Sequence, residues 1–231
     1  MSDAAVAHPS NLAHHFESYD QQRESASLGM WLFVAQEVMF FGGIFTAYLI
    51  NRLKHPGAFK VASSELDIWL GGINTAVLII SSFTMAMAVR ESQLARGKRC
   101  AGFLIATILL GLTFVGIKAV EYNDKFVHHH VPGAHFHFEV TPEMVAKAHA
   151  GPDEIARGAE AFFSIYFAMT GLHALHMIIG VVVVSLLVLP AIRGRFNAEY
   201  HNPVECTGLY WHFVDIVWIF LFPLLYLLGR H

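Results

Sequence analysis

Five long apolar segments dominate the sequence and limit the folds that the chain can adopt. They cover approximately residues 28–50, 68–89, 101–120, 161–189 and 204–228. A helix needs roughly 20 apolar residues to cross the core of a bilayer. A single crossing segment satisfies its backbone hydrogen bonds only as a helix, because lipid offers no partners. The sequence therefore predicts an all-α integral membrane protein with five transmembrane helices.

The composition excludes several other classes of protein. Hydrophobic residues make up 55% of the chain and charged residues only 14%, whereas a soluble domain carries about 25% charged residues. The formal net charge of −3 leaves no strong basic field, so we expect no nucleic-acid partner. Cys100 and Cys206 lie too far apart for a zinc or redox motif, and we interpret them as small apolar residues.

The segments divide the chain into four parts. These are an N-terminal surface segment (1–27), helices one to three (28–121), a long histidine-rich extramembrane loop (122–158), and helices four and five (159–231). Short connections favour antiparallel neighbours, so we expect a bundle of two helices plus three. Five spans put the termini on opposite sides of the membrane. The dense basic loop at 90–99 favours an N-terminus on the inner side.

Ionisable residues inside the spans are candidates for function, because they are costly in lipid. Glu37 lies near the middle of the first span with no basic residue within one turn, so desolvation favours its neutral form. Two interpretations stay open: a proton-relay or helix-docking carboxylate, and a neutral acid hydrogen-bonded to a neighbouring helix. Lys118 and Glu121 are three residues apart near the end of the third span, where we expect local neutralisation.

Histidines occur on two of the predicted helices. His173 and His176 share a face of the fourth span, and His212 and Asp215 have the same spacing on the fifth. Histidines from two helices can ligate a haem or a metal. Such a site needs three or four converging ligands, however, so interhelical hydrogen bonding is the favoured interpretation.

A second histidine cluster lies in the long loop. It comprises His128, His129, His130, His135 and His137. These side chains supply enough nitrogen ligands for zinc or copper. They lie in a loop with proline and glycine and no visible preorganisation, which favours a solvated loop or adventitious binding over a purposeful site.

Four motifs in order resemble subunit III of haem-copper terminal oxidases, and most closely that of a bacterial cytochrome c oxidase. They are Trp-Leu-Phe-x-x-x-Glu-x-x-Phe-Phe (31–41), Glu-Tyr (121–122), Gly-Leu-His-Ala-Leu-His-x-x-x-Gly (171–180) and Glu-x-x-x-x-Tyr-Trp-His-Phe-Val-Asp-Ile-Val-Trp (205–218). The long form of this family has seven helices. This chain is similar to the five-helix forms, which lack the first two. Glu205 and the ending at 219–226 look closer to cytochrome c oxidases than to quinol oxidases.

The resemblance implies a non-catalytic subunit III of a proton-pumping cytochrome c oxidase. Such a subunit carries no haem and no copper, which reside in partner subunits. It packs on subunit I beside subunit II and small subunits, and holds phospholipid in a cleft between its helix bundles. Membership of a larger respiratory supercomplex stays open. It supports proton uptake and lasting turnover. The implied location is the bacterial inner membrane, with a cytoplasmic N-terminus and a periplasmic C-terminus.

The resemblance also suggests roles for particular residues. Glu37 is expected to be a buried acid that faces the lipid cleft. The expected interhelical polar network comprises His173, His176, Glu205 and His212, with Asp215 nearby. Trp31, Trp211 and Trp218 are candidates for packing and lipid contact, and Arg90 and Arg96 are expected to hold anionic headgroups.

Three alternatives remain. The first is subunit III of a bo-type ubiquinol oxidase. The second is a small proton-coupled transporter that uses Glu37 and the histidines as a relay. The third is a haem b anchor that uses His173 or His176 together with His212.

Overall fold

The computed structural model describes residues 16–128, 131–133 and 136–229. Five helices are long and apolar enough to cross a membrane, which confirms the predicted fold class. They are α1 (Tyr19–Lys54), α3 (Ile68–Gln93), α4 (Gly97–Val127), α6 (Pro152–Ile192) and α7 (Asn202–Phe222), which continues as the π-helical turn η1 (Pro223–Leu227). Two short helices, α2 (Pro56–Ser64) and α5 (Pro142–Ala148), lie between them. The described residues form no strand.

Helix ends differ from the predicted boundaries because the helices continue past the edges of the apolar runs. Ser18 caps α1 by accepting a hydrogen bond from the backbone of Gln21, so residues 19–27 continue the first spanning helix. Helix α6 begins at Pro152 and has 41 residues. At 1.5 Å per residue it is about 60 Å long, twice the roughly 30 Å core of a bilayer, so it extends beyond the membrane.

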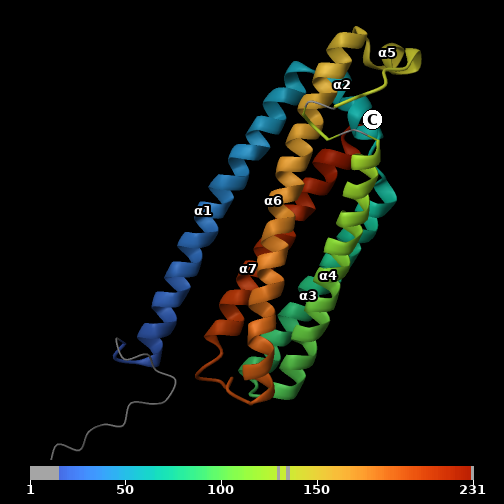
Figure 1. The fold of residues 1–231 in the computed structure, drawn as a ribbon. Helices are drawn as coiled ribbons and strands as arrows, with labels where there is room; N and C mark the ends of the chain where they lie inside the picture. Colours follow the sequence, from blue (N-terminus) through green and yellow to red (C-terminus); the bar gives the residue numbers. More distant parts are fainter. Residues whose placement is uncertain (1–15, 129–130, 134–135, 230–231) are drawn as a thin grey trace, which may run out of the picture.

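The helices do not divide into two plus three (Figure 1). Helix α3 forms an antiparallel hairpin with α4 and also packs on α7, while α4 packs on α6. Helix α1 lies at one side, against α6 and α7, and has no extensive contact with α3. The predicted pairing of the first two spans is therefore wrong. The reason is α2, which packs on α6 and carries the chain away from α1 before α3 begins.

Large aromatic side chains fill the centre of the bundle. Trp211, Trp218 and Phe114 are at most 1% exposed. Gly111 permits this packing, because a Cβ atom at its position would lie 2.8 Å from the Trp211 ring. Small residues that admit close neighbours are typical of membrane helix interfaces.

Candidate functional site

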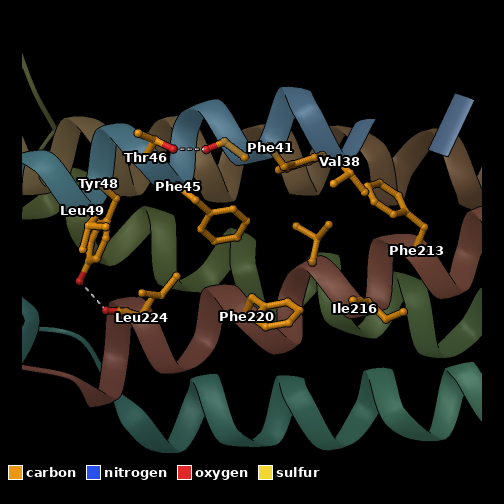
Figure 2. Close-up of a pocket in the computed structure, with 12 residues that line it drawn as sticks. Val38, Phe41, Phe45, Thr46, Tyr48, Leu49, Phe213, Ile216, Phe220 and Leu224 are labelled. Atoms are coloured by element: carbon orange, nitrogen blue, oxygen red, sulfur yellow. Dashed lines mark hydrogen bonds between the residues drawn. The ribbon is translucent and has the colours of Figure 1, made fainter. Parts of the chain in front are cut away.

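An apolar groove of about 480 Å³ lies between α1 and α7. Figure 2 shows the rings of Phe45 and Phe220 between the two helices. The hydroxyl groups of Thr46 and Tyr48 both donate to backbone carbonyl groups, so neither has a hydrogen left to donate to a ligand in the groove. The groove therefore suits an apolar chain. Its lining residues are Val38, Phe41, Gly42, Phe45, Thr46, Tyr48, Leu49, Phe213, Ile216, Val217, Phe220 and Leu224.

Glu37 meets His176 beside this groove. Glu37 is 7% exposed, and its Oε2 lies 3.2 Å from Nε2 of His176 on α6. This is an ion-pair distance without the alignment of a hydrogen bond. The His176 ring also packs edge-on against Phe41, which lines the groove. Sequence spacing showed no basic neighbour for Glu37 within one turn, because its partner comes from another helix.

The other ring nitrogen of His176 is held by its own helix. Its Nδ1 lies 2.8 Å from the carbonyl oxygen of Leu172. A carbonyl group only accepts, so Nδ1 carries a hydrogen atom. Nε2 is then the ring nitrogen that faces the carboxyl group of Glu37, so the two residues join α6 to α1.

His173 does not join this pair. Positions three apart on a helix differ by about 60° in direction, enough to face different neighbours. The ring of His173 is fully buried, 5.3 Å from that of Phe114 and 5.2 Å from that of Trp218. Neither ring nitrogen has a hydrogen-bond partner among the described residues. The expected place of His173 in the interhelical polar network is therefore wrong, because this residue packs among aromatic rings.

The polar residues of α7 also lie apart from Glu37. His212 Nδ1 is 2.7 Å from the Ser82 hydroxyl oxygen of α3, which confirms an interhelical hydrogen bond for this histidine. Asp215 is 3% exposed, and neither carboxyl oxygen has a partner among the described residues. Glu205 pairs with His201 one turn earlier at 3.4 Å. Its side chain is 41% exposed, so placing it in the interhelical network was wrong: it lies in the first turn of α7.

A buried ion pair connects three parts of the chain. Lys118 and Glu121 are each 3% exposed, and Nζ lies 2.9 Å from Oε2. The amine also donates to the hydroxyl oxygens of Tyr166 and Tyr226. Both hydroxyl groups donate in turn to Oε1 of Glu121. The pair is thus an internal link between α4, α6 and η1 rather than a local neutralisation at the membrane interface.

Sequence reasoning missed the two tyrosines in this link. Tyr166 and Tyr226 lie in apolar runs, and a tyrosine there gives no sign of its partner. One available signal was the combination of a lysine and an acid at helical spacing within a span, since such charges need further hydrogen bonds when buried.

For Trp211 and Trp218 the expected packing role is confirmed, while the expected lipid contact is wrong. Trp211 donates from Nε1 to Ser81 and Trp218 donates to Thr75, both on α3. Side chains and backbone of α4 and α6 also cover the two rings, which are at most 1% exposed. Trp31 differs, since it is 62% exposed on α1.

The two arginines flank the turn between α3 and α4. Arg90 lies in the last turn of α3, and Arg96 lies 3.7 Å from Glu91. Neither arginine lines the groove between α1 and α7. Lipid binding by these two residues stays a prediction.

Much of the loop histidine cluster lies outside the described residues. His129, His130 and His135 belong to the undescribed part, while His128 and His137 are exposed. Within the described ranges, no three His, Cys, Asp or Glu side chains converge as metal ligands. The cluster therefore stays untested.

Comparison with known proteins gives consistent matches over most of the chain. The family described as cytochrome c oxidase subunit III matches residues 12–141 and 149–230. Quinol oxidase subunit 3 of Bacillus subtilis (strain 168) is 32% identical over 203 residues, which cover 87% of this chain and 86% of the relative. Cytochrome c oxidase subunit 3 of Thermostichus vulcanus is 30% identical over 207 residues, 88% of this chain and 87% of the relative. Probable cytochrome c oxidase subunit 3 of Rickettsia conorii (strain ATCC VR-613 / Malish 7) is 30% identical over 222 residues, covering 90% of this chain and 69% of the relative.

Proposed function

The chain belongs to the family of cytochrome c oxidase subunit III, and on this premise we propose that it is the non-catalytic subunit III of a proton-pumping cytochrome c oxidase. It packs on subunit I beside subunit II and small subunits. It binds phospholipid and supports proton uptake and lasting turnover. It lies in the bacterial inner membrane as a multi-pass protein, with its N-terminus in the cytoplasm and its C-terminus in the periplasm. We also propose that the complex can assemble into a larger respiratory supercomplex.

The arrangement of the intramembrane histidines supports an accessory role. His176 faces Glu37 on α1, His212 bonds to Ser82 on α3, and His173 packs among aromatic rings. Three histidines with three separate sets of neighbours do not form a common ligand set for a haem or a copper ion. We therefore propose that the haem and copper chemistry belongs to partner subunits.

The groove between α1 and α7 supports lipid binding by this chain. Its walls are apolar and its hydroxyl groups are bonded internally. Lipid acyl chains are the apolar chains that a membrane supplies. We propose that one such chain fills the groove beside the Glu37–His176 pair.

A quinol oxidase is the second candidate, because a quinol oxidase subunit 3 is 32% identical to this chain. The donor is tested by purifying the oxidase through a tag on this chain. We expect haem-containing subunits to copurify and reduced cytochrome c to support oxygen consumption. Oxidation of a quinol alone would favour the second candidate. Purification of this chain without haem-containing partners would contradict both and favour a transporter.

Lipid binding is tested with two matched glycine variants. Gly42 lines the groove, and nothing lies within 4 Å of a Cβ atom built there. We expect Gly42→Leu to fill part of the groove and to lower the phospholipid retained by the purified oxidase, as measured by lipid mass spectrometry. Gly102→Leu is the control, since Gly102 on α4 also has open space around it but lies away from the groove. Equal lipid content in the two variants would refute the assignment of the groove.

Binding of anionic headgroups by the basic turn is a separate proposal. We expect Arg90→Gln combined with Arg96→Gln to leave initial turnover nearly intact, to lower retained lipid and to hasten the decay of activity. The measurements are lipid mass spectrometry and oxygen-consumption traces. Unchanged lipid content and unchanged decay would mean that these residues set only the topology.

A further inference from the structure

A second groove, of about 450 Å³, lies between α3 and α7. Its rim is apolar and faces outward, with Ile79 56% and Phe83 63% exposed. Its wall also carries three polar side chains, Ser82, His212 and Asp215. This composition distinguishes it from the groove between α1 and α7, where the hydroxyl groups are bonded to the backbone.

The polar side chains of this groove form only some of their possible hydrogen bonds within the described part of the chain. Ser82 bonds to Nδ1 of His212, which leaves Nε2 without a hydrogen bond among the described residues. The Ser82 hydroxyl also lies beside the Asp215 carboxyl group, but both carboxyl oxygens lack a bond of proper geometry among those residues. Polar groups left unpaired in hydrocarbon are costly, so a further hydrogen-bonding group is expected at this point.

The depth of the groove limits where that group can come from. His212 lies ten residues after the start of α7 at Asn202 and fifteen before the end of η1 at Leu227. At 1.5 Å per residue these separations are about 15 and 22 Å, which places His212 near the middle of the bilayer. Lipid headgroups lie about 15 Å from that plane. At this depth lipid supplies only acyl chains, which cannot hydrogen-bond.

We propose that the α3–α7 groove docks a membrane-spanning helix of a partner oxidase subunit, which presents an amide or hydroxyl side chain to His212. The proposal rests on the proposed function, since it requires partner subunits in the membrane. A volume of about 450 Å³ admits side chains from one face of a helix, as ridges packing into a groove, but not a whole helix. The exposed Ile79 and Phe83 supply the apolar part of the contact.

Crosslinking in the assembled oxidase tests the identity of the occupant. A photoreactive phenylalanine analogue is placed at Phe83 in the chain expressed with its complex in native membranes. The matched control carries the analogue at Leu186, which is 70% exposed on α6. We expect the Phe83 position to crosslink to a spanning segment of an oxidase subunit, identified by mass spectrometry, in higher yield than the control.

The outcomes separate this proposal from the proposed function. If the chain copurifies with haem-containing subunits but Phe83 gives only lipid or quinone adducts, the docking proposal fails and the proposed function stands. If the chain does not copurify with such subunits, the proposed function fails.

Retention of the chain during detergent extraction gives a second test. Gln retains an amide that can hydrogen-bond in place of His212, whereas Leu cannot. We expect His212→Leu to lower the fraction of the chain retained on the oxidase by about three- to eighteen-fold, the range that interhelical hydrogen bonds in membranes support. His212→Gln should restore most of it. Equal retention of the Leu variant and the unaltered chain would overturn the proposal.

Discussion

Removing the amine of Lys118 should strongly destabilise the helical bundle. All three hydrogen-bond donors of the ammonium group are used, by Glu121, Tyr166 and Tyr226. Lys118→Met keeps a side chain of similar length but leaves the Glu121 carboxylate buried without its cation. Breaking a buried pair in this way costs about 3–5 kcal/mol. We therefore expect the free energy of unfolding to fall by about 4 kcal/mol.

A double variant separates the loss of the charge from the loss of packing. In Lys118→Met with Glu121→Gln, no charge remains buried, and the amide oxygen can still accept from both tyrosine hydroxyl groups. Replacement of a buried ion pair by neutral residues is often nearly neutral for stability. We expect the double variant to recover most of the loss. Arg96→Gln serves as a surface control, because its pair with Glu91 is 3.7 Å long and the arginine side chain is 52% exposed. We expect that change to cost at most about 1 kcal/mol.

The assay is equilibrium unfolding of the purified chain in mixed micelles, followed by circular dichroism as the denaturing detergent increases. A loss below about 1 kcal/mol in Lys118→Met, the cost of ordinary hydrogen bonds, would refute the importance of the buried charge. A double variant no more stable than the single variant would also refute it, since the damage would then come from packing.

Three further predictions concern the acid, the packing and the cofactors. Glu37→Gln should preserve assembly, because the amide of Gln can still hydrogen-bond near His176; copurification with haem-containing subunits measures this, and loss of those subunits in the variant would contradict it. Gly111→Ala should lower the free energy of unfolding by about 1–3 kcal/mol, because the added Cβ atom clashes with the Trp211 ring. Gly116→Ala is the control and should be neutral or stabilising, because the space around Gly116 is open. The same unfolding assay compares the two variants. The chain separated from its partners should show no Soret band and no stoichiometric copper by visible spectroscopy and metal analysis, and a haem band that follows this polypeptide would contradict the accessory role.

The positions of the spanning helices could be predicted from the sequence because they depend on local properties. Some 20 apolar residues in a row must satisfy their own backbone in lipid, whatever surrounds them. Four spaced motifs, of which the one around His212 and Asp215 is the most specific, also indicated the family. The helix ends were predicted less well, since the Ser18 cap extends α1 beyond its apolar run.

The partners of the polar residues were decided only by the tertiary structure. Sequence spacing predicts that His173 and His176 point in similar directions from one helix. In the structure α1 and α4 pack on different sides of α6, so His176 contacts α1 and His173 contacts α4. Sequence spacing likewise predicted that Lys118 and Glu121 pair with each other. It did not predict their two tyrosine partners, which come from α6 and η1. The physical reason is that the sequence of a helix determines only the directions in which its side chains point around its own axis. Which neighbour each direction meets depends on the rotation and order of all the helices, and here α2 changed that order by separating α1 from α3.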